Sequence, residues 1–333
     1  MKVLLTGAFG NLGASSLELL LKEGKHQVCC SDRQLPRNEA VANKLAKLGE
    51  FETAWGDITD PGDCARIVKD VDCILHLAAI IPPLSEQDPE LVTAVNIQGT
   101  KNLLAAALNG GMSPKFFFAS SVTVHGVRHS SPPPRRADED IEGTDNYTRS
   151  KVECEIAIRD SGLPWTILRV GAALPIDMLD RDMKSSLATS FGIPLNQRIE
   201  FVHPADVATA VVRAIDAPTE GKILYAGGGA DCQMTNGVFQ GKLFEAMGMN
   251  MPPDAAFRHP KNDDDYWYTD YMDTEETQRL LNFQNHSFED YLRDVRKQFG
   301  WRLFFTRLLS PIIGWFVLMC SPYYKENKAS GMG

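Results

Sequence analysis

Three glycines, Gly7, Gly10 and Gly13, directly follow the first apolar run of the chain. The run Val3–Leu5 predicts a buried strand, and the leucines of Leu12–Leu21 predict a helix, so the glycines occupy the turn between the two. Glycine permits a tight turn and a close approach of the backbone to a ligand. A helix N-terminus adds unpaired N–H groups and the positive end of a dipole. The pattern therefore predicts a pyrophosphate-binding turn.

Short apolar runs alternate with helical patterns along the first half of the chain. The expected strands are Gln27–Asp32, Val71–Leu77, Lys115–Ser120 and Trp165–Arg169, and the expected helices are Glu39–Leu48, Asp63–Lys69, Pro89–Leu108 and Tyr147–Ser161. A further helix and strand of the same unit are expected at Ala205–Ala217 and Lys222–Ala226. This alternation predicts an α/β fold with a doubly wound parallel sheet and ligands at the carboxyl ends of the strands.

The second apolar run ends in Asp32, nineteen residues beyond Gly13. An acidic residue at this distance is placed to accept hydrogen bonds from an adenosine ribose. Its charge would repel a 2′-phosphate, which favours NAD over NADP, and the adjacent Arg33 would soften that preference. The alternative is that Asp32 is only a solvated strand end.

Composition narrows the function classes. The chain has 333 residues, and 44% of them are apolar, which supports a sizeable core. The net charge of −9 argues against a nucleic-acid partner, which needs a basic face. The seven cysteines show no metal-ligand spacing, so we expect reduced core thiols, no metal and a cytoplasmic protein.

Seven short motifs follow one another along the chain. They are Thr6–Gly13 (TGAFGNLG), Gly56–Asp60 (GDITD), His76–Ala79 (HLAA), Asn96–Thr100 (NIQGT), Ser120–Gly126 (SSVTVHG), Tyr147–Lys151 (YTRSK) and Phe201–Val207 (FVHPADV). With these motifs in this order, the chain resembles the extended short-chain dehydrogenase/reductase superfamily over roughly residues 1–300. The resemblance is to its NAD-dependent epimerase/dehydratase-like branch, which has hydroxysteroid dehydrogenase-like relatives.

The resemblance implies a Rossmann-type fold with a smaller C-terminal substrate lobe, and NAD as the cofactor. The residues expected to hold the cofactor are Gly7, Phe9, Gly10, Asn11, Leu12, Gly13, Asp32, Arg33, Asp57, Ile58, Leu77, Ala78, Ala79, Asn96, Tyr147, Lys151 and Val170. By family analogy, Asp57 and Ile58 would contact the adenine ring.

Tyr147 and Lys151 lie four residues apart in a helical stretch, and therefore on one helix face. A tyrosine ionises near pH ~10 and is a poor base at neutrality. A nearby ammonium favours the phenolate, so we expect Lys151 to lower the pKa of Tyr147 and make it a proton acceptor or donor. Ser121 matches the catalytic serine of the family and would polarise the substrate oxygen. Asn96 either supports a proton relay, as in many relatives, or is a helix cap.

The expected domain organisation is interleaved. Residues 1–170, with 201–226, form the NAD(P)-binding domain. Residues 171–200 and 227–300 form the substrate lobe, and residues 301–333 form an apolar tail beyond the usual end of the family.

The sequence favours an oxidoreductase that moves hydride between nicotinamide and a secondary alcohol or ketone. The apolar segments Ile80–Leu84 and Gly171–Ile176 suit an apolar substrate. Few basic residues of the lobe could hold a second pyrophosphate; they are Arg181, Lys184 and Arg198. A sugar-nucleotide epimerase or dehydratase is the first alternative, and a non-catalytic NAD(P)-binding regulator is the second.

The tail suggests a further partner. The stretch Leu308–Cys320 has no charged residue, but it is short for a membrane span of ~20 residues. Basic residues flank it, which is typical of a segment lying on the cytoplasmic face of a membrane. The alternative is a helix packed on the lobe or on a dimer partner. By family analogy we expect a homodimer built from the helices around 90–110 and 147–161.

Overall fold

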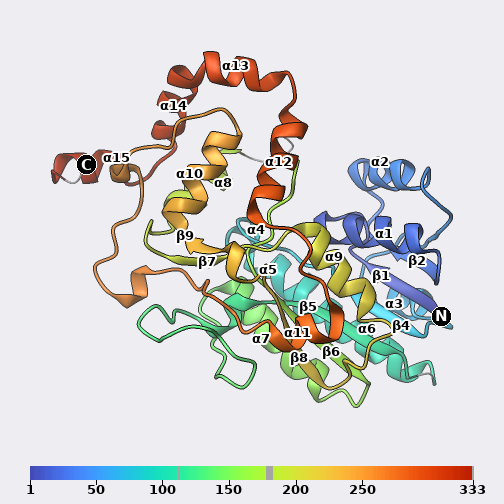
Figure 1. Cartoon of the computed structure of the whole chain (residues 1–333). Coiled ribbons are helices and arrows are strands. Elements are labelled where there is room, and N and C mark those ends of the chain that lie inside the picture. The colour runs from blue at the N-terminus through green and yellow to red at the C-terminus, as the bar shows by residue number, and fades with distance from the viewer. Residues whose placement is uncertain (112, 178–182, 332–333) are drawn as a thin grey trace.

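A seven-stranded parallel sheet forms the centre of the chain (Figure 1). The computed structural model describes residues 1–111, 113–177 and 183–331. The strands, in the spatial order β3-β2-β1-β4-β5-β6-β8, are β3 (Glu52–Thr53), β2 (Gln27–Ser31), β1 (Lys2–Thr6), β4 (Cys73–His76), β5 (Lys115–Ser121), β6 (Trp165–Val170) and β8 (Lys222–Ala226). Every neighbouring pair is parallel. The chain runs outward from β1 to β3 and then returns to β4, so the order reverses beside β1, where such sheets bind ligands. The predicted doubly wound sheet is confirmed.

Helices cover both faces of this sheet. One face is covered by α1 (Asn11–Glu23), α2 (Pro36–Leu45) and α9 (Pro204–Arg213), and the other by α3 (Pro61–Ile67), α6 (Gly99–Asn109) and α7 (Asn146–Arg159). Val3 and Leu5 of β1 pack into the first core and Leu4 into the second, and all three are fully buried. Successive strand residues point to opposite faces, so a strand covered on both sides is apolar throughout.

The region expected to be one helix over Pro89–Leu108 is divided. It consists of α5 (Pro89–Val92), a π-helical segment η1 (Thr93–Gln98) and α6. Asp88 begins α5, because its carboxylate accepts a hydrogen bond from the Leu91 N–H at 3.0 Å. The two-residue strand β3 was not predicted, since so short a segment shows no alternation. The short helices α4 (Leu84–Gln87) and η2 (Val122–His125) follow β4 and β5.

Beyond β6 the chain builds a second, smaller layer. It contains the antiparallel pair β7 (Arg198–Glu200) and β9 (Gln233–Thr235), the helices α8 (Met183–Phe191), α10 (Asn236–Ala246) and α12 (Phe288–Phe299), and the short turns η3 (Ala230–Cys232), η4 (Asp254–Ala256) and η5 (Asp263–Asp265). Its core is aromatic: Phe201 packs against Phe288 and Tyr291 with ring centroids 5.0 and 4.7 Å apart. Helix α11 (Glu275–Leu281) instead contacts α9 and β8 of the sheet layer.

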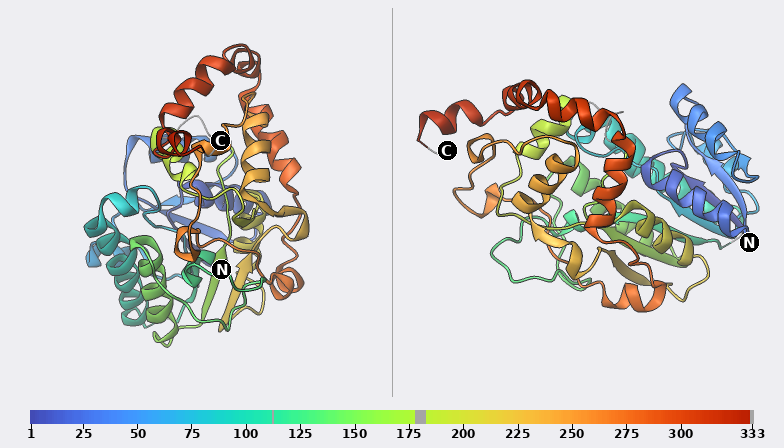
Figure 2. Two further views of the ribbon diagram at one scale, coloured as in Figure 1. Left: turned by 90° about the vertical axis from the view of Figure 1, so that its left-hand side faces the viewer. Right: turned by 45° about the horizontal axis from the view of Figure 1, so that its top comes forward.

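Three helices end the chain: α13 (Arg302–Leu308), α14 (Ser310–Met319) and α15 (Tyr324–Ala329). They lie at the periphery in every view (Figures 1 and 2). Within the described ranges, no single helix is both long and apolar enough to cross a membrane. Only α13 and α14 taken together reach that length and composition, and they are bent by 74° at their junction.

Candidate active site

The three glycines behind β1 have different structural roles. Gly7 has φ +67°, and a Cβ there would lie 2.7 Å from the Ala78 Cα. At Gly13 a Cβ would lie 2.0 Å from the Gly7 carbonyl oxygen, so this glycine lets α1 pack closely on the turn. Gly10 is exposed, and a Cβ there would meet only the Gly7 oxygen, at 3.3 Å. Gly10 therefore leaves space through which a pyrophosphate can approach the backbone.

The N-terminus of α1 faces the same turn. Asn11 and Leu12 open the helix, and among the described residues no side chain caps it. Its first N–H groups thus remain available to an anion, and the helix dipole favours negative charge there. The Phe9 ring, also in the turn, is buried against Trp55 with ring centroids 5.2 Å apart, so this side chain fixes the turn.

Asp32 lies directly beside the glycine turn. Its Oδ2 accepts a hydrogen bond from the Phe9 N–H at 3.1 Å, and its Oδ1 accepts from the Arg33 N–H at 2.9 Å and from Asn38 Nδ2 at 3.0 Å. Burial raises the pKa of Asp32, and the two backbone hydrogen bonds oppose the rise. The Arg33 side chain is exposed. Sequence reasoning missed Asn38, whose hydrogen bond holds the Asp32 carboxylate in place.

The remaining expected cofactor residues follow the carboxyl ends of other strands. Asp57 and Ile58 come after β3; the Asp57 Oδ1 accepts hydrogen bonds from the Thr59 N–H and hydroxyl at 2.9 and 2.8 Å. The other four are Leu77, Ala78 and Ala79 after β4, and Val170 at the end of β6. All of these strand ends lie on one edge of the parallel sheet.

Ser121, Tyr147 and Lys151 are brought together from β5 and α7. Ser121 lies beside Tyr147 and lowers the pKa of its hydroxyl, and the Ser121 Oγ accepts hydrogen bonds from the Thr123 hydroxyl and N–H at 2.9 and 3.3 Å. Lys151 Nζ lies 5.7 Å from the Tyr147 ring centroid and donates a hydrogen bond to the Ala119 carbonyl at 2.7 Å. Lys151 is buried, and Tyr147 is half-buried. The arrangement offers a hydroxyl pair to a substrate oxygen, with an amine behind it.

The expected lowering of the Tyr147 pKa is wrong for this structure. Burial raises the pKa of Tyr147 to about 12, and the hydrogen bond with Ser121 only partly opposes this. The ammonium group does not offset the burial, because it points to the Ala119 carbonyl and lies 4.6 Å from the Phe118 ring centroid. Burial also lowers the pKa of Lys151 to about 8. Tyr147 is therefore protonated at neutral pH.

Asn96 lies inside η1, not at a helix end, so the alternative that it caps a helix is wrong. Its Oδ1 accepts a hydrogen bond from the Ile80 N–H at 2.7 Å, and its Nδ2 donates to the Ile80 carbonyl and the Ser150 hydroxyl, both at 3.0 Å. Asn96 thus ties the segment after β4 to α7, the helix that carries Tyr147 and Lys151.

A buried polar network lies behind the site, and sequence reasoning missed it. Glu155 accepts hydrogen bonds from the Ser120 hydroxyl at 2.5 Å and from Arg169 Nη2 at 2.8 Å. Arg169 Nη1 donates to the Tyr225 hydroxyl at 3.0 Å, and that hydroxyl is 2.6 Å from His125 Nε2. The network joins β5, α7, β6 and β8 next to Ser121, and only long-range contacts reveal it.

A second missed contact holds the start of α7. The Glu86 carboxylate of α4 accepts hydrogen bonds from the N–H groups of Asn146 and Tyr147 at 3.2 and 3.1 Å. A carboxylate at a helix N-terminus interacts favourably with the helix dipole. The segment after β4 is therefore attached to α7 at two points, through Asn96 and through Glu86.

The expectation of core cysteines is confirmed for six of the seven, and His76 lies in the core as well. His76 is buried between the hydroxyls of Thr6 and Thr100, 2.7 and 2.9 Å from its ring nitrogens, and burial lowers its pKa to about 3. All seven cysteines are unpaired thiols, and six are buried.

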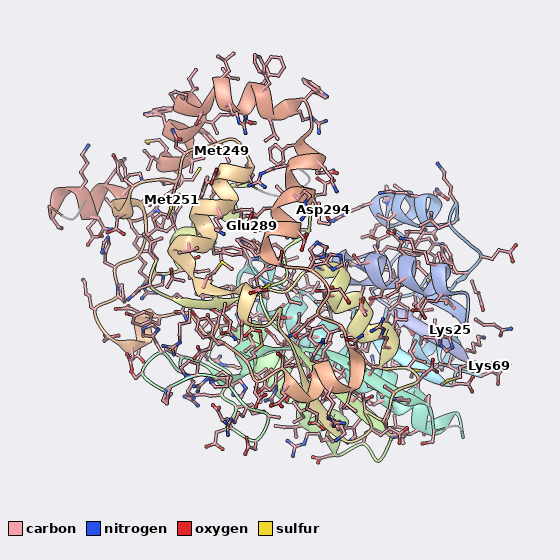
Figure 3. The ribbon with its side chains drawn as sticks, viewed as in Figure 1. Lys25, Lys69, Met249, Met251, Glu289 and Asp294 are labelled. Carbon is pink, nitrogen blue, oxygen red and sulfur yellow. The ribbon has the colours of Figure 1, made fainter. Side chains whose placement is uncertain are left out.

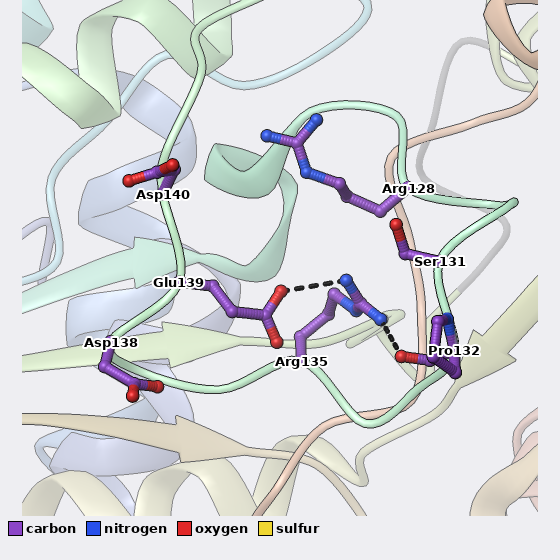
Figure 4. A pocket seen from close by; sticks show the side chains of 7 residues that line it. All are labelled: Arg128, Ser131, Pro132, Arg135, Asp138, Glu139 and Asp140. Carbon is purple, nitrogen blue, oxygen red and sulfur yellow. Dashed lines mark hydrogen bonds and ion pairs between the residues drawn. The ribbon is translucent and has the colours of Figure 1, made fainter.

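Arg198, a basic residue of the second layer, is engaged in the fold. Arg198 Nε lies 2.6 Å from Asp270 Oδ1, and Arg198 Nη2 donates to three backbone carbonyls of the 128–131 segment. Arg181 and the Lys184 side chain fall outside the described residues. A charged pocket of about 590 Å³ lies in the loop between η2 and α7 (Figure 4), where Arg135 pairs with Glu139. This pocket does not include Ser121, Tyr147 or Lys151.

The chain was compared with known protein families and proteins. The model of the NAD dependent epimerase/dehydratase family matches residues 3–227. A 3-beta-hydroxysteroid dehydrogenase of Mycolicibacterium neoaurum is 33% identical over 163 residues, which are 46% of this chain and 41% of the relative. Sanguinarine reductase of Eschscholzia californica is 27% identical over 242 residues, which are 65% of this chain and 84% of the relative. The chain thus spans about two-fifths of the length of the hydroxysteroid dehydrogenase.

Solved structures share the fold at low identity. A UDP-glucose-4-epimerase of Stenotrophomonas maltophila, solved with NAD, has a TM-score of 0.74 and 22% identity, covering 92% of this chain and 99% of that one. A dTDP-glucose 4,6-dehydratase of Streptomyces venezuelae, also with NAD, has a TM-score of 0.75 and 23% identity, with coverages of 90% and 97%.

Proposed function

The chain belongs to the NAD-dependent epimerase/dehydratase family, and on that premise we propose that it is an oxidoreductase moving hydride between nicotinamide and a secondary alcohol or ketone. The observation that carries the proposal is the grouping of Ser121, Tyr147 and Lys151 at the carboxyl edge of the sheet. This group lies at the end of β5, two strands from the glycine turn behind β1.

NAD is the cofactor in this proposal. Gly10 leaves an opening that any Cβ would narrow, the start of α1 is uncapped among the described side chains, and Asp32 supplies a carboxylate beside the turn. These features suit a pyrophosphate and an adenosine ribose. Solved structures of the same fold hold NAD, which supports this choice.

When bound, the nicotinamide would accept or supply the hydride, and the residues of the chain would handle the proton. In ketone reduction, Tyr147 donates its proton to the carbonyl oxygen, which becomes the hydroxyl of the product. Ser121 holds that oxygen by a hydrogen bond. Lys151 stabilises the phenolate left on Tyr147 when it carries its own positive charge. Alcohol oxidation is the reverse step and starts from the Tyr147 phenolate, which takes the proton back from the alcohol.

We propose an apolar substrate, bound between the domain of residues 1–170 with 201–226 and the lobe of residues 171–200 and 227–300. Ile81 and Leu84, after β4, are 47% and 45% exposed, and they offer apolar surface next to the segment held by Asn96. Arg198 is committed to Asp270 and to backbone carbonyls, which argues against its gripping a second pyrophosphate. The sequence similarity to a hydroxysteroid dehydrogenase points the same way.

A sugar-nucleotide epimerase or dehydratase is the second candidate, favoured by the fold of the solved neighbours. Such an enzyme oxidises and reduces its cofactor within one cycle and retains it. A screen of hydroxysteroids, long-chain alcohols, ketones and nucleotide sugars, read by NADH absorbance, tests the proposal. Conversion of a nucleotide sugar without net NADH change would favour the second candidate.

We also propose a cytoplasmic homodimer formed by the outer faces of α6 and α7. Leu108 on α6 and Ile156 on α7 are both 48% exposed, and both are large apolar residues. Sedimentation of the wild type should give a dimer, and Leu108→Glu with Ile156→Glu should give a monomer.

A further inference from the structure

Among the described residues, the large apolar side chains that are most exposed lie in α13, in α14 and at Trp301 just before them. Trp301, Phe304, Leu308, Ile312 and Trp315 are 65–74% exposed. Among the described residues outside this tail, no large apolar side chain is more than 50% exposed. Soluble monomers rarely leave a continuous patch of this kind uncovered, so the face is expected to contact another surface.

The exposure does not arise from a detached tail. Val317 of α14 is buried in a cluster with Phe191 and Phe257. After α14, Asn327 Nδ2 donates to the carbonyls of Ala255 and Phe257 at 3.0 and 2.9 Å. Met249 and Met251 pack in the same cluster, on the protein side of the tail (Figure 3). One side of the tail is thus fixed to the lobe, and the other side is bare.

The shape of the pair suits a surface better than a span. The helices contain 7 and 10 residues and are bent by 74°. At 1.5 Å per residue they are about 10 and 15 Å long, against a hydrocarbon core of ~30 Å. Neither helix can cross a bilayer, whereas both can lie with their bare side in the interface.

The charge around α13 and α14 indicates which kind of surface their bare side contacts. The whole chain has a net charge of −9, but residues 295–325 contain five basic residues and no acidic one. The five are Arg296, Lys297, Arg302, Arg307 and Lys325. A second copy placed on this face would bring like charges together around the apolar patch, whereas anionic lipid headgroups would neutralise them. Trp301 and Trp315 are residues that favour the headgroup level.

We propose that the bare face of α13 and α14 binds the surface of a bilayer containing anionic lipids, with both helices lying in the interface. This goes beyond the proposed reaction and does not depend on it, because no residue of the patch belongs to the candidate active site. The attachment would hold the substrate lobe at the membrane, where apolar alcohols and ketones accumulate.

Vesicle sedimentation of the purified full-length chain tests the proposal. Vesicles of phosphatidylcholine alone are compared with vesicles of phosphatidylcholine and phosphatidylglycerol. The wild type should bind the mixed vesicles at least about tenfold more strongly than the neutral ones. Phe304→Ser, Leu308→Ser and Ile312→Ser together should lower binding about tenfold or more. The matched control, Leu35→Ser, Leu48→Ser and Val238→Ser, removes exposed apolar side chains elsewhere and should bind like the wild type.

A second variant distinguishes a specific loss of vesicle binding from misfolding. Arg302→Gln with Arg307→Gln keeps the apolar face and should lower the preference for mixed over neutral vesicles about tenfold or more. Wild type remaining in the supernatant with both vesicle types would overturn the proposal, as would an equal loss in the control variant. A self-association without vesicles that the serine variant abolishes would assign the face to a second copy instead.

Discussion

Tyr147 is the residue on which the proposed chemistry depends. Tyr147→Phe keeps the ring and removes only the hydroxyl that transfers the proton. Because general acid–base catalysis contributes ~10²–10⁴-fold, kcat should fall by that factor. NAD binding, measured by titration, should be nearly unchanged. A variant that keeps most of its kcat would exclude Tyr147 as the acid.

Asp32 should set the cofactor preference. The wild type should bind NAD more tightly than NADP, because a half-buried carboxylate beside the turn repels a 2′-phosphate. Asp32→Asn removes the charge and keeps one acceptor oxygen where the carboxylate has two, so it should narrow the difference between the two dissociation constants. Tighter binding of NADP by the wild type would contradict this prediction and point to Arg33.

Lys151 should make the kcat/KM of ketone reduction depend on pH. Burial lowers its pKa to about 8, so its positive charge is present below that pH and is lost as the pH rises through it. The kcat/KM of ketone reduction should therefore be constant around neutral pH and fall above pH about 8. Tyr147, with a pKa of about 12, stays protonated over this range. The matched variant Lys151→Met should have a low kcat/KM that shows no step near pH 8. A wild-type kcat/KM that is constant up to pH ~10 would exclude this role of the Lys151 charge.

At the scale of elements, two glycines of the turn after β1 have different roles: Gly13 serves stability, and Gly10 serves cofactor binding. Gly13→Ala places a Cβ 2.0 Å from the Gly7 oxygen, which forces α1 away from the turn and should cost about 1–3 kcal/mol of unfolding free energy. Gly10→Ala meets nothing closer than 3.3 Å, so its Tm should stay close to wild type while NAD binding weakens. Thermal unfolding and NAD titration of both variants check this; equal destabilisation by the two would refute the division of roles.

The same elements show what sequence can predict. Periodicity found β8 with its observed bounds and placed α1 and α7 within about two residues, because their apolar patterns are local. Periodicity did not find the division of residues 89–109 around Asn96, which depends on contacts with Ile80 and Ser150. The pKa of Tyr147 was also predicted in the wrong direction, because sequence spacing shows the neighbouring charge and not the burial.

At the scale of the whole molecule, backbone and core contacts join the sheet layer and the smaller layer. The Ala172–Phe201 bridge connects the segment after β6 to the second layer, and Leu281 and Phe283 return to the core of the sheet. The proposed cofactor site therefore belongs to the sheet layer, and the proposed substrate site lies between the two layers. Hydride transfer between them requires that both be filled together.

The most direct test of this account is the balance between NAD and substrate in one reaction. Purified full-length chain is incubated with a hydroxysteroid and excess NAD, and NADH and ketone are measured in the same sample. The account predicts equal amounts of NADH and ketone, far exceeding the amount of enzyme. Substrate conversion with cofactor that stays bound and shows no net reduction would contradict it.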